Sequence, residues 1–224
     1  MPSQSPAILP YPFDPYPTNA GFPYRLAADL CNEIICEQSA PPSVKGLFIY
    51  GDPSYGKTNL LLGIQAALKS NNISTIYIKD EDFFKQLFQS YHSHTNYLEE
   101  DLLTFQTAPV LLFDDFGKSL AYTRESNSNP SKNKWISNLE ERLRLLHDLL
   151  AFRLKYSLTT FIASDCVQPD FGKFEAEFLS PSPNSNSSAK AICNILQCIT
   201  YPCYLYTPHA DLSLKHTGGS DFDQ

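Results

Sequence analysis

The sequence predicts one α/β domain in which a parallel β-sheet lies between layers of helices. Segments with strand composition alternate along the chain with segments of helical periodicity, which is typical of a doubly wound sheet. Residues 110–113 form a continuous apolar run that ends at two carboxylates, as expected for a central strand buried on both faces. A chain of 224 residues is long enough for one such core and too short for two ordinary domains.

The first part of the chain, residues 1–41, is expected to form an arm followed by a helix. Residues 1–23 contain seven prolines among tyrosines and phenylalanines, a composition that disfavours a helix and favours an extended segment. From Tyr24 to Gln38 apolar residues recur at helical spacing, and two prolines follow. The arm either lies against its own domain or anchors a partner through its aromatic side chains, and both interpretations remain open.

The main domain is expected to span residues 42–208. Strand-forming residues are dense in five segments, namely Gly46–Tyr50, Ile73–Ile78, Val110–Phe113, Thr159–Ala163 and Tyr201–Tyr206. Helical periodicity occurs in Lys57–Lys69, Asp80–Tyr91, Leu98–Phe105, Trp135–Lys155 and Ala189–Ile199. The segment 180–188 is a low-complexity insertion that we expect to be disordered, and residues 209–224 are interpreted as a frayed tail.

Charge and hydropathy exclude several classes of protein. A formal net charge of -7 argues against a protein that coats duplex DNA by counterion release. The longest apolar runs are interrupted by charge well before the about 20 residues that a bilayer crossing requires. The N-terminal segment lacks the basic region and apolar stretch of an export signal. We therefore expect a cytoplasmic protein without a membrane partner.

Six cysteines leave two interpretations open. Cys193, Cys198 and Cys203 recur at an even spacing, which would suit a metal site if their thiolates converged. However, this spacing places successive thiols about 140° apart around a helix, and a zinc site normally includes a tight C-x-x-C pair. We therefore favour buried, reduced cysteines that behave as small hydrophobic residues.

The segment 51–58 reads GDPSYGKT and matches the phosphate-binding pattern G-x-x-x-x-G-K-[ST]. It lies between a predicted strand and a predicted helix, where backbone N–H groups and the helix dipole can face phosphate oxygens. Lys57 is expected to reach the β- and γ-phosphates of ATP, and the Thr58 hydroxyl to bind Mg²⁺. The predicted nucleotide-binding residues are Gly51, Asp52, Pro53, Ser54, Tyr55, Gly56, Lys57 and Thr58.

Two other strand ends supply further site residues. We expect Asp114 to bind Mg²⁺ together with Thr58, and Asp115 to orient or deprotonate the attacking water. Ser164 and Asp165 end the next strand, where they could hydrogen-bond the γ-phosphate or that water. The alternatives are an ordinary loop cap for the first pair and a helix N-cap for the second.

The order of three segments, KGLFIYGDPSYGKT, VLLFDDFG and TTFIASD, resembles the bacterial replicative helicase-loader family of DnaC/DnaI type, which belongs to the AAA+ ATPases. The resemblance covers about Pro42 to Asp165 and extends to the initiator DnaA and the transposition helper IstB. It implies a P-loop NTPase sheet sandwiched between helices, without a C-terminal helical lid. It also implies an ATP-binding protein that engages a hexameric DnaB-type helicase, helps place it on single-stranded DNA, and forms homo-oligomers on ATP binding.

Departures from the family pattern concern catalysis. The family expects an arginine finger in the helix after the sensor strand, yet no Arg follows Arg153, and Lys190 is the only basic residue of that predicted helix. Asp165 stands where the family usually has Asn. We therefore expect a weak ATPase, unless a partner donates the missing cation or Arg142 or Arg144 acts across a subunit boundary.

Several functional alternatives stay open at this point. The chain could be a nucleotide-bound adaptor that does not hydrolyse ATP, or a DnaA-like or IstB-like ATPase acting as initiation regulator or transposition helper. A small-molecule kinase is disfavoured because no Arg-rich lid is evident. Direct contact with single-stranded DNA is equally open, since the acidic run 99–101 lies close to the basic and aromatic candidates. Those candidates are Lys85, Tyr91, His92, His94 and Tyr97.

Overall fold

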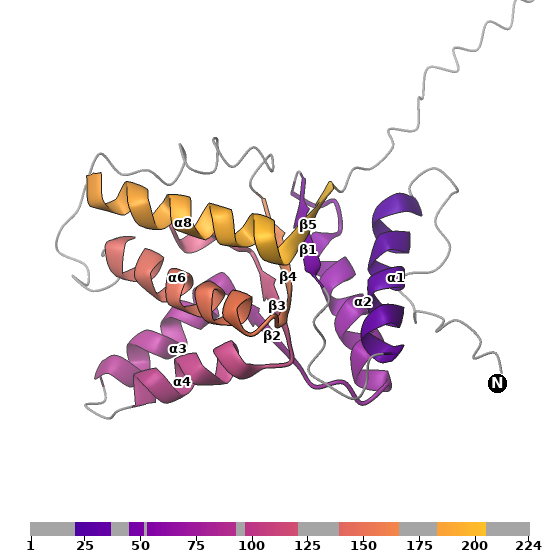
Figure 1. The fold of residues 1–224 in the computed structure, drawn as a ribbon, viewed down its shortest axis with the longest axis horizontal. Helices are drawn as coiled ribbons and strands as arrows, with labels where there is room; N and C mark the ends of the chain where they lie inside the picture. The colour runs from indigo at the N-terminus through magenta and orange to yellow at the C-terminus, as the bar shows by residue number, and fades with distance from the viewer. Residues whose placement is uncertain are drawn as a thin grey trace, which may run out of the picture.

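Five parallel strands form one sheet with helices on both of its faces (Figure 1). This computed structural model describes residues 21–36, 45–51, 53–92, 97–120, 139–165 and 183–204. The strands are β1 (Gly46–Tyr50), β2 (Thr75–Lys79), β3 (Val110–Asp114), β4 (Thr159–Ser164) and β5 (Thr200–Tyr204). They pair in the order β2-β3-β4-β1-β5, and every pair is parallel. The predicted fold class is therefore confirmed.

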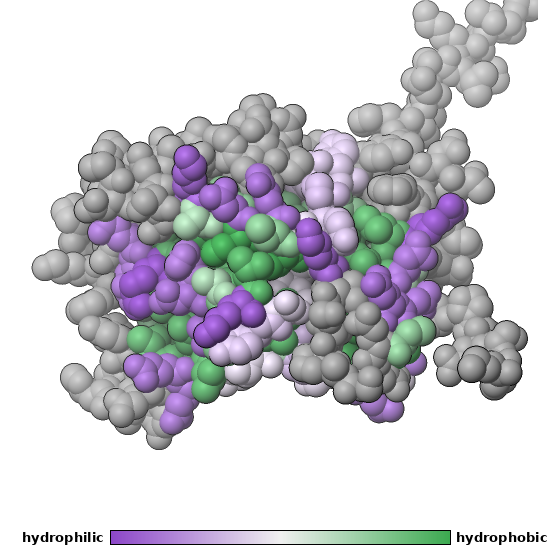
Figure 2. Space-filling view, in the orientation of Figure 1, coloured by the Kyte–Doolittle hydropathy of each residue, from purple (hydrophilic) through white to green (hydrophobic). Residues whose placement is uncertain are grey.

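The described helices form two layers. They are α1 (Gly21–Cys36), α2 (Lys57–Ser70), α3 (Asp80–His92), α4 (Tyr97–Thr107), α6 (Leu139–Lys155) and α8 (Pro183–Ile199). Helices α1 and α2 cover one face of the sheet, and α3, α4, α6 and α8 cover the other (Figure 1). In Figure 2 hydrophobic residues lie in the middle of the visible face, where α6 and α8 meet, with hydrophilic residues around them.

Side chains of the central strands alternate between the two layers, as the pleat of a β-strand requires. In β1, Leu47 and Ile49 pack against α1 and α2, whereas Phe48 packs with residues of α3, α6 and α8. In β3, Leu112 faces the first layer and Phe113 the second. Strands β1 and β3 carry continuous apolar runs over residues 47–49 and 110–113 because both of their faces are covered, which explains why these two segments show no polar alternation.

Among the predicted helix boundaries, the starts of α1 and α8 differ most from the structure where both can be compared. Helix α1 begins at Gly21, so Pro23, expected in an extended arm, lies in the first helical turn. Proline is tolerated there because first-turn N–H groups have no intrahelical acceptor. Helix α8 begins at Pro183, so residues 183–188 of the expected disordered insertion are helical. Proline suits the first helical position, and Ser and Asn suit helix starts.

Several sequence-based expectations fall outside the described residues. They concern the arm over residues 1–20, the start of the long helix at residues 135–138, residues 180–182 of the insertion, and the tail 209–224. The expected absence of a C-terminal lid also concerns residues after 204, which lie outside the described ranges.

Arg153 joins three parts of the fold at the edge opposite the strand ends. Its guanidinium is fully buried, and burial lowers its pKa to about 9, so the group stays charged at neutral pH. It donates to the carbonyl oxygens of Phe105, Gln106 and Ala108 at 3.0, 3.2 and 2.8 Å, to Thr160 Oγ1 at 2.8 Å, and to the carbonyl of Thr159. These bonds tie α6 to the end of α4 and to the start of β4.

Replacing Arg153 with Met should lower the free energy of unfolding by about 3 kcal/mol or more. The methionine keeps most of the volume but leaves several buried carbonyl groups without their donor. Urea unfolding followed by circular dichroism measures the loss. Lys155→Met in the same helix is the matched control, because Lys155 is exposed. Equal stability of the two variants would contradict the structural role of Arg153.

Candidate nucleotide-binding site

The loop between β1 and α2 has the backbone that a phosphate-binding loop needs. Gly51 and Gly56 have positive φ angles of 144° and 84°, a region that residues with a Cβ rarely adopt. Gly56 is the N-cap of α2, which has no side-chain cap hydrogen bond and no acidic residue in its first turn. A helix N-terminus of this kind favours an anion, because its first N–H groups and its dipole point outward.

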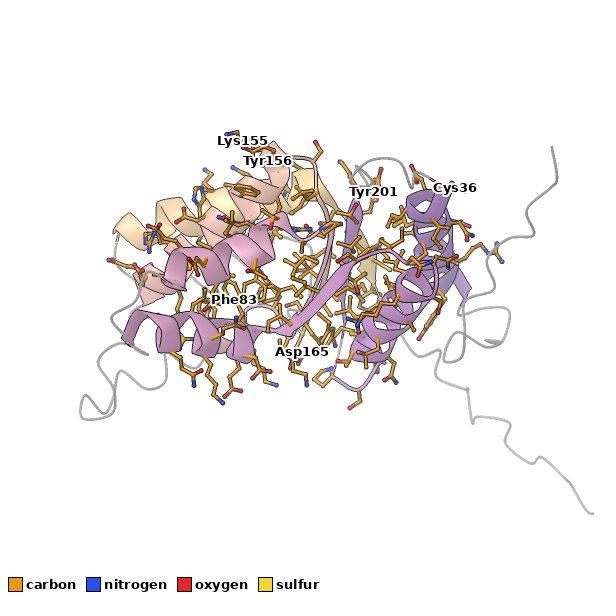
Figure 3. The ribbon with its side chains drawn as sticks, turned by 90° about the horizontal axis from the view of Figure 1, so that it is seen from below. Cys36, Phe83, Lys155, Tyr156, Asp165 and Tyr201 are labelled. Atoms are coloured by element: carbon orange, nitrogen blue, oxygen red, sulfur yellow. The ribbon has the colours of Figure 1, made fainter. Side chains whose placement is uncertain are left out.

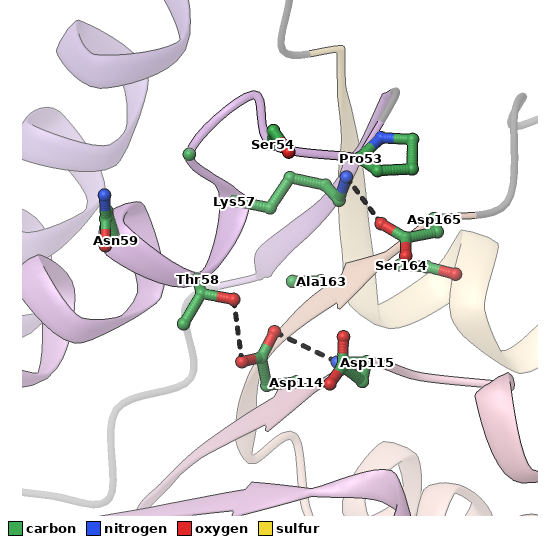
Figure 4. Close-up of a pocket in the computed structure, with 11 residues that line it drawn as sticks. Pro53, Ser54, Lys57, Thr58, Asn59, Asp114, Asp115, Ala163, Ser164 and Asp165 are labelled. Carbon is green, nitrogen blue, oxygen red and sulfur yellow. Dashed lines mark hydrogen bonds and ion pairs between the residues drawn. The ribbon is translucent and has the colours of Figure 1, made fainter.

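Lys57 connects the loop to the end of β4. Its side chain is buried, and its Nζ donates to the Gly51 carbonyl oxygen at 2.7 Å. The same ammonium lies 2.7 Å from Asp165 Oδ1, whose side chain is 50% exposed (Figure 4). A phosphate that reached Lys57 would therefore compete with a carboxylate already in place.

Asp114 lies at the centre of a hydrogen-bond network and is only 1% exposed. Its Oδ2 accepts hydrogen bonds from Thr58 Oγ1 at 3.0 Å and from the Tyr77 hydroxyl at 2.6 Å. Its Oδ1 accepts the backbone N–H of Asp115 at 3.0 Å. A buried carboxylate beside a threonine hydroxyl supplies the hard oxygen donors that Mg²⁺ prefers, so these residues fit that cation.

Asp115 follows in a left-handed backbone conformation with φ 54°, which turns its side chain into the cavity. Its carboxylate lies 3.6 Å from Lys118 Nζ. The next residue is fixed to β4, because the Phe116 N–H donates to the Ala163 carbonyl at 2.8 Å and the Ser164 hydroxyl donates to the Phe116 carbonyl at 2.8 Å. The turn after β3 is thus held against β4 from both sides.

A second pair of residues holds the continuation of this turn. The fully buried carboxylate of Asp80 accepts the backbone N–H of Ser119 at 2.7 Å and of Gly117 at 3.3 Å. Burial raises the pKa of Asp80, and these bonds and nearby Arg142 oppose that rise. Arg142 is buried, donates to the Ser119 carbonyl at 3.3 Å and lies 4.8 Å above the Phe84 ring.

The burial of Arg142 bears on one expectation from the sequence. Its guanidinium would have to leave Ser119 and the Phe84 ring to reach a nucleotide on a neighbouring subunit. Arg144 differs, since its side chain is 53% exposed and pairs with Glu141 and Asp148 on its own helix. The sequence alone does not show which of the two arginines is buried, because both lie in a charged segment of the predicted helix.

These groups surround a cavity of about 300 Å³ at the carboxyl ends of the strands (Figure 4). Figure 3 places Asp165 at one edge of the molecule and Lys155, Tyr156 and Tyr201 at the opposite edge, which agrees with a common strand direction. The lining residues are Pro53, Ser54, Gly56, Lys57, Thr58, Asn59, Asp114, Asp115, Ala163, Ser164 and Asp165. The structure therefore brings together most of the residues that the sequence predicts.

Two described loop residues that were predicted, Gly51 and Tyr55, are not among those that line this cavity. Gly51 accepts the hydrogen bond from Lys57, Tyr55 packs against the core cluster of α1 and α2, and Asp52 lies outside the described residues. Sequence reasoning also missed Tyr77 and Asp80. The signal that could have found them is their position near the end of β2. Because β2 and β3 are parallel neighbours, polar side chains at the end of β2 lie beside the carboxylates at the end of β3.

The described cysteines are free thiols and are not all buried, which corrects part of the expectation. Cys31, Cys193 and Cys203 are buried, whereas Cys36 and Cys198 are exposed. Burial raises the pKa of Cys31 to about 12, which makes that thiol unreactive. Within the described ranges no three His, Cys, Asp or Glu residues group as a metal site, and none of the helices there is long and apolar enough to cross a bilayer.

The matched part of the chain is similar in sequence to two bacterial replication proteins. No family model matches the sequence. The replicative helicase loader DnaI of Bacillus subtilis is 30% identical over 126 residues, which are 56% of this chain and 34% of DnaI. The initiator DnaA of Streptococcus mutans is 35% identical over 140 residues, 56% of this chain and 30% of DnaA. The chain thus spans about a third of the length of these relatives.

Solved structures show the same fold. A crystal structure of DnaI has a TM-score of 0.61 and 22% identity, covering 82% of this chain and 85% of that chain. A crystal structure of the DnaC helicase loader has a TM-score of 0.55 and 17% identity, and the match covers 87% of this chain and 96% of that chain. A structure of the replication initiator DnaA bound to AMPPCP and single-stranded DNA has a TM-score of 0.53 and 17% identity, and the match covers 82% of this chain and 46% of that chain. The chain is therefore homologous to the loader DnaI over part of its length and shares the fold of the DnaI and DnaC structures, which confirms the resemblance to proteins of DnaC/DnaI type.

Proposed function

We propose that the chain is an ATP-binding, helicase-loader-like protein of DNA replication, which helps recruit or load a hexameric DnaB-type helicase on single-stranded DNA. The observation that carries this proposal is the convergence of Lys57, Thr58, Asp114 and Asp165 on one cavity, in a chain homologous to a loader. Since those relatives act in replication, we infer a cytoplasmic location. The ATP-binding domain would correspond to residues 42–208.

The geometry supports a specific division of tasks among the site residues. Residues 51–58 would bind the phosphates, with Lys57 turning from Asp165 to the nucleotide. Thr58 and Asp114 would hold Mg²⁺, which offsets the phosphate charge when it is bound. Asp115, which lines the same cavity, would orient or deprotonate the attacking water.

The end of β4 is the candidate sensor. Both of its polar residues line the cavity, and Asp165 is the better placed of the two, since its carboxylate is half exposed and already contacts Lys57. Ser164 donates its hydroxyl hydrogen to the Phe116 carbonyl, so it could donate to a phosphate only by breaking that bond. We assign it chiefly to positioning the turn that carries Asp115.

A non-hydrolysing adaptor is the second candidate function. Among the described residues that line the cavity there is one cation, Lys57, and there is no arginine. Without a guanidinium the charge that develops during phosphoryl transfer has little stabilisation. A DnaA-like initiation regulator and an IstB-like helper use the same type of site, and the matches to DnaA are compatible with the former.

Replacing Lys57 with Ala should weaken ATP binding by about 10- to 100-fold, because a charge-assisted contact to the β- and γ-phosphates is lost. Isothermal titration of ATP in the presence of Mg²⁺ measures the change. Lys69→Ala is the matched control, since Lys69 lies in the last turn of the same helix. Equal ATP affinity in both variants would argue against the assignment of the phosphate-binding loop.

Hydrolysis by the isolated chain should be slower by on the order of 10³-fold or more than with a partner that donates an arginine. Single-turnover measurements with and without the helicase detect the difference. Asp115→Asn should abolish the remaining rate while ATP still binds. A fast rate for the isolated chain that Arg144→Ala leaves unchanged would mean that the site needs no donated cation.

Association with the cognate DnaB-type helicase tests the biological part of the proposal. We expect the two purified proteins to co-elute in size-exclusion chromatography, with the amount of complex depending on ATP. Lys57→Ala should remove that dependence. If no complex forms at any nucleotide concentration, while ATP binding is intact, the loader assignment fails and a DnaA-like or IstB-like role becomes the better interpretation.

A further inference from the structure

Tyr77 lies on the strand beside β3 and reaches the carboxylate that is expected to bind the metal. In the β2–β3 register it is opposite Leu112, and its ring packs with the cluster of α1 and α2. From there its hydroxyl donates to Asp114 Oδ2 at 2.6 Å. Tyr77 is therefore a donor to this oxygen that the neighbouring strand holds in place.

Two hydroxyl groups share the same oxygen, and they differ in their relation to the cavity. Thr58 lines the cavity and is itself an expected metal ligand, so its bond to Asp114 is the one that a bound cation would alter. Tyr77 is not among the lining residues and approaches Asp114 from the neighbouring strand. Its bond can persist whether or not the cavity holds a ligand.

We propose that Tyr77 is a positioning residue that orients the Asp114 carboxylate for Mg²⁺, an inference that rests on the proposed nucleotide-binding function. A buried carboxylate held by donors on both of its oxygens has one orientation available, because rotation would break those bonds. Thr58 can offer an oxygen lone pair to a cation while its hydroxyl hydrogen still faces Asp114, so Tyr77 acts as a second donor to the same carboxylate oxygen from outside the cavity. Partners of this kind, which touch a metal ligand and not the metal, typically change metal affinity by about 10- to 100-fold.

Removal of the hydroxyl could act in two opposite ways. A hydrogen bond withdraws charge from a carboxylate, so its loss would by itself strengthen the attraction for a cation. Its loss also frees the side chain to rotate, which weakens binding. We expect orientation to dominate, because Asp114 is nearly inaccessible and must present one particular oxygen edge toward Thr58.

The test uses the full chain with Tyr77→Phe, which keeps the aromatic ring and removes only the hydroxyl. The non-hydrolysable analogue AMPPCP is titrated by calorimetry, first in EDTA and then over a range of Mg²⁺ concentrations. We expect the affinity of Tyr77→Phe for AMPPCP in EDTA to equal that of wild-type protein. The Mg²⁺ concentration that gives half of the increase in AMPPCP affinity should rise by about 10-fold. Tyr50→Phe is the control, since Tyr50 is a partly buried tyrosine of β1 that packs against the opposite core cluster.

The outcomes separate the positioning role from the proposed function. If wild-type protein binds AMPPCP with Mg²⁺ and Tyr77→Phe has the same midpoint or a lower one, the positioning role is wrong and the proposed function stands. If wild-type protein binds no nucleotide, both are wrong. If Tyr77→Phe loses affinity equally in EDTA and in Mg²⁺, its effect is merely structural, which also overturns the proposal. Thermal unfolding of the variant, and Tyr77→Ile as a second strand-compatible change, guard against misfolding.

Discussion

The site depends on the parallel pairing of β1, β3 and β4. Parallel strands end at one edge, so the loop after β1, the carboxylates after β3 and the polar pair after β4 meet there, although they are far apart in sequence. Such a sheet is stable only when helices bury both of its faces, and the two core clusters do this. Arg153 fixes the opposite edge, where it joins α4, α6 and β4.

At the cavity the chain's own groups pair in the positions where ligands are expected. Lys57 contacts Asp165, Asp114 contacts Thr58 and Tyr77, and the Asp115 carboxylate lies near Lys118. Such pairing holds charged side chains in place, since an unpaired buried charge is costly. A ligand then exchanges one set of charge contacts for another, and its affinity is the difference between the two.

The sequence predicted the fold well because its evidence is local. The apolar runs of β1 and β3 and the GKT segment each need only a few neighbouring residues to be recognised. The start of α8 was missed because Ser and Asn are frequent both in disordered segments and at helix starts. The bond between Tyr77 and Asp114 joins residues that are distant in sequence, and only the strand order β2-β3 brings them together.

The same strand order has a consequence for the charge balance of the site. Among the described residues that line the cavity, one lysine faces three aspartates, so the lining itself disfavours a polyanion. The buried Arg142 and Arg153 do not offset this, because both are committed to backbone carbonyls of the fold. If a nucleoside triphosphate binds here, a divalent cation at Thr58 and Asp114 must therefore carry much of the compensation. On the function proposed above, a cation donated by another molecule would supply the rest of the compensation, and turnover would then depend on assembly.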